Sequence, residues 1–486
     1  MFRGLPAARY GKDDAESKRN LVALGERMAA TFDGPKDGFD PEESGIPALY
    51  TYFGQFVDHD ITFDPMSTLV KHSDPDGLVD FRTPALDLDN VYGRGPNDQP
   101  YMYDRSGRKF LLGDQISGGK DQNACDLARN DANPARALIG DPRNDENAIV
   151  SQLQGLFLRF HNRFADDHPE ITEFIDLQRQ VRFHYQYIVL HDFLPRIVNS
   201  QVLAALKTDG VFDQNKLRFY VWKNDPYMPV EFSVAAYRLG HSMIRPGYRL
   251  NDNDLTLLPI FPVRSKDLNE GLTGFRAMNP HWGIDWGRFI DIDTRSYGGD
   301  ADPPDEPMKQ RLQFAYRIDT SLVNPLGDLP PEIAENPSSL PTRNLLRSLQ
   351  LGLPSGQEVA RYMRVTPLKD DEIMIGKAVD KPEEGDVIGT IASIPELTAF
   401  KGNCPLWTYI LAEAGRHQET VEIPVTEKKM ITTPRLGPVG GRIVAEVFLG
   451  MMFGDDDSLL KLDPKWHPPS GAQFQLKDFV RYALGM

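Results

Sequence analysis

The sequence has little cysteine, no long hydrophobic run and a deficit of positive charge. Its two cysteines, Cys125 and Cys404, cannot form a disulfide framework, and no CxxC pair offers a zinc site. No stretch approaches the roughly 20 apolar residues that cross a bilayer, so we expect no integral membrane segment. Lysine and arginine number 54 against 70 aspartates and glutamates, a net charge of −16, which argues against a nucleic-acid partner.

The first residues, MFRGLPAARYGKDDAESKRN, lack the apolar core of a secretory signal peptide. We therefore expect a soluble protein that is either cytoplasmic or exported by a non-classical route. Apolar residues make up 40% of the composition and aromatic residues 10%, which is enough for a large buried core. The composition thus predicts a globular protein and leaves its oligomeric state open.

The pattern of apolar residues predicts a mainly α fold in a single large domain, with few short strands and long loops. Residues 1–45 are polar and rich in glycine, proline and charge, so we expect an arm around a domain of residues 46–486. The best strand signal is KLRFYVW, near residues 216–222. Helical spacing is clearest at residues 48–63, 145–165, 177–197, 234–244, 340–351 and 439–453.

The motif GQFVDHD, residues 54–60, falls within the first of these helices. Helical spacing places Gln55, Asp58 and His59 on the same face. A histidine beside an amide and a carboxylate suits acid/base chemistry near neutral pH. A helical histidine is more often structural than catalytic, so this motif alone leaves both interpretations open.

Two further motifs carry an arginine near a candidate site. In GDPRNDEN, residues 140–147, Arg143 and Glu146 lie three apart at a predicted helix start, where acidic side chains also suit the helix dipole. In AAYRLGHSMIRP, residues 235–246, His241 follows a glycine that permits close approach of backbone or a flat ligand, and Arg238 lies one turn earlier. A core histidine remains the alternative for His241.

The segment TPALDLD, residues 83–89, alternates oxygen-bearing side chains at Thr83, Asp87 and Asp89. In an extended loop these side chains converge on one side, and intervening carbonyls can join them, as calcium requires. An acidic solvated turn fits the same spacing equally well.

In this order, the four motifs resemble the animal-type haem peroxidases of the peroxidase-cyclooxygenase superfamily, which includes myeloperoxidase and lactoperoxidase. The resemblance covers residues 46–450 and includes segments similar to bacterial members: FLRFHNRFAD, YQYIVLHDFLP, TRNLLRSLQLGLPS and LGPVGGRIVAEVFLG. It implies the large helical fold of that family and a haem b cofactor.

The resemblance also implies roles for individual residues. His59 matches the family's distal histidine, Arg143 its distal arginine and Gln55 the glutamine of the distal pocket. His241 matches the ligand of the haem iron, and Asn344 the asparagine expected to accept a hydrogen bond from that imidazole.

Three further groups of residues carry expectations from the same family. Arg238 matches an arginine that faces a haem propionate, while Asp58 and Glu146 match carboxylates that can form ester links to the haem. The expected calcium ligands are Asp60, Thr83, Ala85 through its carbonyl, Asp87 and Asp89. Because Asp60 follows His59, calcium there would hold the distal helix in place.

The implied activity is the reduction of hydrogen peroxide through an oxyferryl intermediate, followed by oxidation of bromide, iodide, thiocyanate or phenols, as in a response to oxidative stress. Myeloperoxidase has a methionine, bonded to the haem, where this chain has Asn147, so chloride oxidation is not expected.

Two alternatives differ in class from a peroxidase. A fatty-acid dioxygenase or cyclooxygenase-like enzyme would carry a radical tyrosine three residues before the proximal histidine, where this chain has Arg238. Tyr237 lies one residue out of register, about 100° around a helix. A non-catalytic calcium-binding adhesion protein on the same fold predicts loss of His59, Arg143 or His241, all of which are present.

Overall fold

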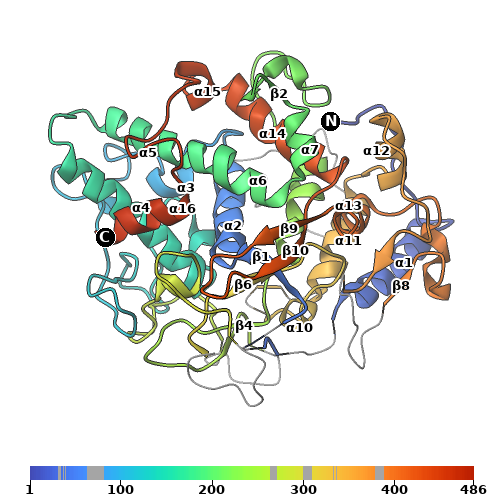
Figure 1. Cartoon of the computed structure of the whole chain (residues 1–486), viewed down its shortest axis with the longest axis horizontal. Coiled ribbons are helices and arrows are strands. Elements are labelled where there is room, and N and C mark those ends of the chain that lie inside the picture. Colours follow the sequence, from blue (N-terminus) through green and yellow to red (C-terminus); the bar gives the residue numbers. More distant parts are fainter. Residues whose placement is uncertain are drawn as a thin grey trace.

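The computed structural model describes the chain except residues 31–33, 37, 39, 63–81, 263–270, 299–308, 332, 335 and 378–387. Helices dominate the described residues (Figure 1). The α-helices are α1 (Asp14–Met28), α2 (Leu49–Ile61), α3 (Asp89–Tyr92), α4 (Ala148–Asp167), α5 (Phe174–Ile188), α6 (Leu194–Ile197), α7 (Ser200–Ala204), α8 (Val230–Ser233), α10 (Asn324–Gly327), α11 (Leu340–Gln350), α12 (Gly356–Tyr362), α13 (Leu406–Ala414), α14 (Gly440–Gly454), α15 (Leu459–Leu462) and α16 (Leu476–Leu484).

The strands are short and form two-stranded antiparallel pairs among the described residues. The pairs are β1 (Glu43–Pro47) with β6 (Phe314–Tyr316), β2 (Lys207–Thr208) with β3 (Val211–Phe212), β4 (Gly247–Tyr248) with β5 (Leu258–Pro259), β7 (Met374–Ile375) with β8 (Gly389–Thr390), and β9 (Gln418–Glu422) with β10 (Met430–Pro434). The mainly α fold with few short strands is therefore confirmed.

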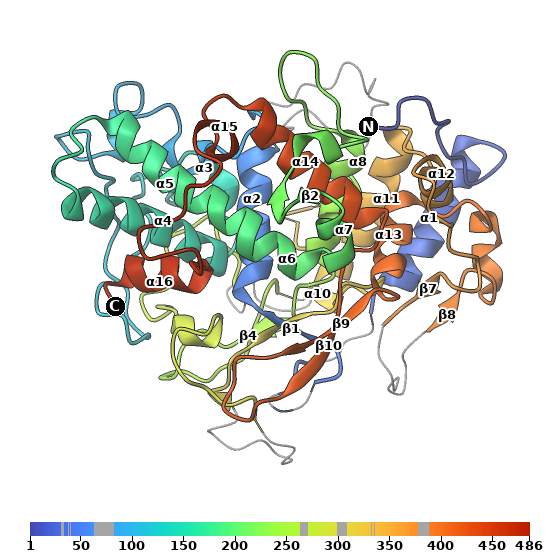
Figure 2. The same ribbon diagram turned by 45° about the horizontal axis from the view of Figure 1, so that its top comes forward.

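Helix α2 runs through the middle of the molecule. In both views α4, α5 and α16 lie on one side of it, and α1, α11, α12 and α13 lie on the other (Figures 1 and 2). Its side chains Phe53, Phe56 and Val57 are fully buried, and the Phe56 ring stacks on Phe157 of α4 with centroids 4.2 Å apart. Burial on both sides explains why the helix is apolar around most of its circumference.

Helix α4 begins later than its apolar pattern predicts. A 3₁₀ turn, η3 (Pro142–Asp145), precedes it, and Asp141 caps that turn by accepting the Arg143 backbone N–H. The Asn147 side chain then accepts the N–H groups of Ile149 and Val150 and starts α4. The two caps fix the backbone of the GDPRNDEN motif between them.

The helix predicted over residues 177–197 is continuous but not regular. A π-helical turn, η4 (Val189–Phe193), joins α5 to α6. Pro195 lies in the first turn after it and has no N–H to donate. The wider turn accommodates that missing backbone donor.

Two predicted elements are corrected. The strand expected at residues 216–222 is wrong, because the backbone N–H groups of Arg218, Phe219 and Tyr220 all donate to the Glu446 carboxylate, at 2.7–3.0 Å, and not to a neighbouring strand. The helix expected at residues 234–244 is the 3₁₀ helix η6 (Ala236–His241), which is shorter and more tightly wound.

The N-terminal 45 residues include helix α1, which packs against α11 and the 3₁₀ helix η9 (Pro395–Phe400). Its Leu21, Leu24 and Met28 are fully buried and belong to the same apolar cluster as α2. The proposed boundary between an arm and a domain at residue 46 stays a prediction. Over the described ranges, none of the helices combines the length and apolar character needed to cross a membrane.

Candidate active site

A cavity of about 240 Å³ lies where α2 meets η6. His59 of α2 and His241 of η6 both line it, although they are far apart in the sequence. The other expected site residues on its wall are Gln55, Asp58, Glu146 and Arg238. Apolar side chains form one end of the cavity, among them Phe261, Leu326, Leu329, Ile333 and Leu340.

The imidazole of His59 is held by a chain of two amides. Its Nδ1 lies 2.7 Å from the Asn144 Oδ1, and the Asn144 Nδ2 donates to the Gln154 Oε1 at 2.8 Å. Because Asn144 uses its amide group on Gln154, its oxygen faces His59 and Nδ1 carries the proton. Nε2 therefore keeps its lone pair.

His59 is also neutral. Burial, and then the nearby positive charge of Arg143, lower the pKa of His59 from 6.5 to about 3. His59 is therefore unprotonated at neutral pH, and its free ring nitrogen is available as a hydrogen-bond acceptor. Asn144 and Gln154 were not singled out from the sequence. Asn144 at least adjoins Arg143, whereas the position of Gln154 on α4 gave no signal.

Arg143 lies beside His59 but is turned toward Asp141. Its Nη2 donates to the Asp141 Oδ2 at 2.8 Å and to the His59 carbonyl at 3.1 Å, and it also contacts the Thr62 carbonyl. Burial raises the pKa of Asp141, but the hydrogen bonds and charge of Arg143 outweigh it and hold that pKa at about 2. Arg143 is thus fixed near the expected position, while the described cavity wall does not include its side chain.

Gln55 and Glu146 line the cavity with His59 and belong to a hydrogen-bonded row of polar side chains. The Gln55 Nε2 donates to the Glu146 carboxylate, and the Asn147 Nδ2 donates to the Gln55 Oε1 at 3.3 Å. Burial raises the pKa of Glu146 to about 7 and also raises that of Asp58. The structure therefore brings together both carboxyl groups that the family resemblance implicated in ester links.

The hydrogen bond at His241 runs in the direction opposite to the one expected. The Asn344 Oδ1 accepts from the Arg238 Nη1 at 2.8 Å, and the Asn344 Nδ2 lies 2.9 Å from the His241 Nδ1. A guanidinium has no acceptor, so it takes the amide oxygen and leaves the NH₂ group to donate to the imidazole. Asn344 is a donor here, because Arg238 competes for its oxygen. Burial, and then the Arg238 charge, lower the pKa of His241 to about 3.

The expected calcium ligands include three carboxylates that lie close together. Burial raises the pKa of Asp60 to about 7, with a further contribution from the negative charge of Asp89, and burial and Asp60 raise that of Asp87. The Asp60 Oδ2 accepts from the Tyr185 hydroxyl at 3.0 Å, while its buried Oδ1 has no hydrogen-bond partner in the described structure. Mutual repulsion of this kind is relieved by a cation.

The other two expected ligands, Thr83 and the carbonyl of Ala85, give weaker support for a calcium site. The backbone at Ala85 is in a buried position, whereas Thr83 is exposed. Within the described residues no group of three or more acidic, histidine or cysteine side chains has the arrangement of a metal site. Calcium binding therefore stays a prediction.

Comparisons with known proteins relate part of the sequence, and the overall fold, to peroxidases. Residues 69–270 match the family model described as animal haem peroxidase. The structure is similar to peroxidase A from Dictyostelium discoideum, with a TM-score of 0.59 and 17% identity over 99% of this chain and 93% of that one. It is also similar to a fatty acid alpha-dioxygenase from Arabidopsis thaliana, with a TM-score of 0.55 and 15% identity over 98% of this chain and 76% of that one.

Among curated proteins, the chorion peroxidase of Drosophila melanogaster is 25% identical over 339 residues, covering 64% of this chain and 40% of that protein. The fold is thus shared with a peroxidase and with a fatty acid alpha-dioxygenase. Over residues 69–270 the chain therefore resembles the animal haem peroxidase family. It spans between 13% and 40% of the length of the first curated relatives that it matches.

Proposed function

We propose that this protein is a haem peroxidase that reduces hydrogen peroxide and then oxidises small electron donors. The main support is the pair of neutral, buried imidazoles of His59 and His241 on the wall of one cavity. Haem b fits the residues present, because apolar walls suit a porphyrin, a neutral imidazole suits its iron, and Arg238 suits a propionate. When bound, the haem would take two oxidising equivalents from peroxide and pass them to the donor.

On the His59 side of the cavity, His59 supplies a base and Arg143 supplies a positive charge. The bare Nε2 of His59 takes the first proton of peroxide and returns it to the outer oxygen, while Asn144 holds Nδ1–H. The Arg143 charge, fixed by Asp141, favours the negative charge that develops as the O–O bond breaks. Gln55 and Glu146 would orient peroxide beside this base.

On the other side, His241 would ligate iron through Nε2. Ligation by that atom requires the imidazole proton on Nδ1, so Asn344 must present its oxygen in place of its NH₂ group. A carboxylate that takes the Arg238 N–H would release the Asn344 oxygen for this purpose. A haem propionate beside Arg238 is such a carboxylate.

The finer assignments are also proposals. Asp58 and Glu146 line the cavity, and they are the carboxyl groups proposed to form ester links to haem during turnover with peroxide. Asp60, Asp87 and Asp89 are proposed to bind calcium together with Thr83 and the carbonyl of Ala85, supported by the unpartnered oxygen of Asp60. Iodide, bromide, thiocyanate and phenols are the proposed donors.

Fatty-acid dioxygenation is the second candidate. The similarity in fold to the Arabidopsis dioxygenase and the position of Tyr237 on the cavity wall favour it. The Tyr237 hydroxyl donates to the Gly54 carbonyl at 3.2 Å, and its ring stacks on Phe232. Oxygen uptake with a long-chain fatty acid that is lost in Tyr237→Phe would identify this activity.

The direct test is to purify the haem-loaded protein and to measure its Soret band and peroxide-dependent oxidation of iodide and a phenol. The peroxidase proposal expects both activities, with loss of the fast peroxide reaction in His59→Ala. His281→Ala, which removes an exposed histidine, is the matched control. A colourless protein that cannot be loaded with haem would instead favour the adhesion alternative.

A further inference from the structure

Four aromatic rings connect the cavity to a second pocket. Tyr52 lines the cavity from α2, and its ring centroid lies 5.5 Å from that of Tyr248 on β4. Tyr248 stacks on Phe289 at 5.9 Å, and Phe289 contacts Trp286 at 6.3 Å. Trp286, in the 3₁₀ helix η8 (Trp286–Arg288), lines a separate pocket of about 400 Å³. All four rings are at least 95% buried.

We propose that this second pocket is an oxidation site for uncharged phenols, connected to the cavity by Tyr52, Tyr248, Phe289 and Trp286. The inference rests on the proposed function, because the oxidant is the peroxide-oxidised haem. Tyrosine and tryptophan are the side chains most readily oxidised by one electron through their rings, and Phe289 serves as the bridge between Tyr248 and Trp286. A donor too large for the cavity would thus still deliver its electron.

The chemistry of the second pocket selects the donor. Its wall combines the Trp286 ring with the apolar side chains of Ile284, Ile292 and Leu484. An aromatic ring gains from stacking and burial in such a place. Because the site also contains polar groups at its rim, such as Gln122 and Asn123, a hydroxylated ring suits it better than a plain hydrocarbon.

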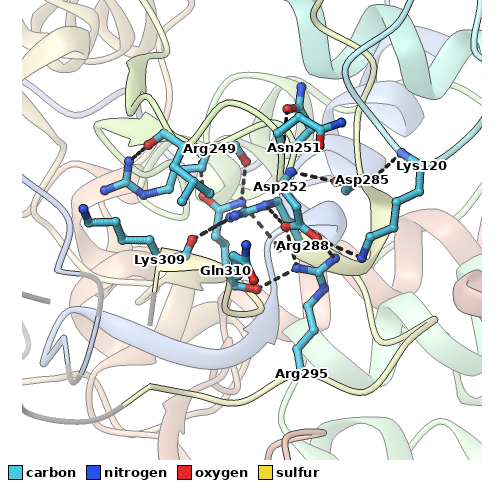
Figure 3. Close-up of polar contacts among 12 residues, drawn as sticks. Lys120, Arg249, Asn251, Asp252, Asp285, Arg288, Arg295, Lys309 and Gln310 are labelled. Carbon is cyan, nitrogen blue, oxygen red and sulfur yellow. Dashed lines mark hydrogen bonds and ion pairs between the residues drawn. The ribbon is translucent and has the colours of Figure 1, made fainter. Parts of the chain in front are cut away.

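The charged groups around the pocket are already paired. The Asp252 carboxylate accepts from Arg288 at 2.8 Å and from Arg295 at 3.0 Å, and it pairs with Lys120 at 2.8 Å (Figure 3). The two oxygens of Asp285 accept the backbone N–H groups of Lys120 and Asp252 at 2.6 and 2.7 Å (Figure 3). Because these charged groups already pair with one another, the pocket offers little electrostatic binding energy to an ionic donor.

The same network holds Trp286 in position. Asp285 and Arg288 bracket the η8 turn, and Arg288 also donates to the Lys309 carbonyl through both Nη atoms at 2.9 Å (Figure 3). Arg288 is fully buried, so its charge depends on these partners. The ring of Trp286 therefore stays between the pocket and Phe289.

Electrons and protons balance along this route. A phenol in the pocket loses one electron to oxidised Trp286 and releases its hydroxyl proton to solvent. The electron passes through Phe289 to Tyr248, then to Tyr52 and to the oxidised haem. Tyr52 and Tyr248 each release the hydroxyl proton on losing an electron and recover a proton when the next electron arrives, so neither is changed over a full cycle. The net change is that the phenol loses one electron and one proton, and the oxidised haem centre gains the electron.

The test uses haem-loaded protein, hydrogen peroxide and two donors: iodide, which enters the cavity, and a phenol tethered to polyethylene glycol, which does not. We expect Trp286→Phe and Tyr248→Phe to lose oxidation of the tethered phenol relative to iodide. Trp466→Phe is the matched control, because this half-buried tryptophan packs against Phe183 and His184 away from the route. An unchanged ratio of the two donors in Trp286→Phe would overturn the proposal.

Two other measurements do not depend on turnover with a donor. After peroxide alone, electron paramagnetic resonance should show a tryptophan radical that is absent in Trp286→Phe, and a signal unchanged by that substitution contradicts the route. In haem-free protein, p-cresol should quench tryptophan fluorescence saturably, and retention of this quenching in Trp286→Phe contradicts the phenol site. If the unsubstituted protein oxidises neither donor, the peroxidase function itself fails, and this result is distinct from loss of the tethered phenol alone.

Discussion

On α2, His59 donates its Nδ1–H to the Asn144 oxygen, whereas on η6 His241 accepts a hydrogen bond from the Asn344 amide. The two asparagines differ in their own partners. Gln154 offers an acceptor to Asn144, so the oxygen of Asn144 is left for the histidine, while Arg238 takes the oxygen of Asn344. Gln154 therefore decides which ring nitrogen of His59 carries no proton, and Arg238 decides the same for His241.

The comparison suggests different tasks for the two sides. The His59 side is already arranged as a base, since Nδ1 is protonated and Nε2 is free. The His241 side is arranged to change when a carboxylate reaches Arg238. The largest expected effect thus belongs to His241.

Replacing His241 by alanine should abolish stable haem ligation, because His59 is then the one imidazole left among the described residues of the cavity wall. The Soret spectrum of the reconstituted variant tests this expectation. His281→Ala should bind haem normally. A normal ligated-haem spectrum in His241→Ala would transfer the ligand role to another residue.

Replacing His59 by alanine should slow the reaction with peroxide by roughly 10²-fold or more, on the scale of general acid/base catalysis, and should spare haem binding. Stopped-flow absorbance after mixing with peroxide measures this step. An unchanged rate would count against the base role of His59.

The two asparagines allow a matched pair of substitutions. Asn344→Ala should weaken haem binding by about 10–100-fold, as is typical when the partner of a metal-ligating histidine is lost. Asn144→Ala should leave haem affinity near normal and slow the peroxide step, because the imidazole is free to adopt the other tautomer. Haem titration and stopped-flow rates separate the two effects. Equal loss of haem affinity in both variants would remove the distinction between the sides.

The pH dependence should come from Glu146 on the His59 side. Its raised pKa of about 7 means that the carboxyl is neutral below pH 7 and charged above it. Before turnover converts Glu146 to an ester, iodide oxidation should therefore weaken as pH rises through 7, by repulsion between the anion and the carboxylate, with phenol oxidation less affected. The KM for iodide across pH 5–9, in the protein and in Glu146→Gln, measures this. Persistence of the inflection in Glu146→Gln would assign it elsewhere.

Calcium should affect the His59 side of the cavity more than the His241 side, and this effect should be smaller than those of the substitutions above. At about 100 times its dissociation constant, a ligand specific for the folded state adds about 2.7 kcal/mol to the unfolding free energy. Chelation should lower the melting temperature and slow the peroxide reaction, because Asp60 is on the same helix as His59. Asp60→Asn should reproduce the effect without chelator. If chelation changed only the spectral signature of haem ligation by His241, the proposed calcium site beside the His59 helix would be contradicted.

Local pattern predicted much of the fold. The apolar periodicity of residues 48–63 and 340–351 was sufficient to place α2 and α11, since the spacing of buried side chains follows directly from helix geometry. Local pattern failed at residues 216–222, where the sequence resembled a strand but the backbone groups bind the distant carboxylate of Glu446. A strand forms only where a second strand hydrogen-bonds to it, and the local sequence does not show whether that second strand is present.

The sequence by itself determined the helical class of this protein and the absence of a disulfide framework, and it singled out His59, His241 and Glu146, which line one cavity. Only the tertiary structure decided that Arg143 binds Asp141, that Asn344 donates to His241, and that four aromatic rings meet between two pockets. The physical reason is that spacing along a helix fixes which face a side chain occupies. The direction of a hydrogen bond and the contact of two rings depend on groups that arrive from distant parts of the chain.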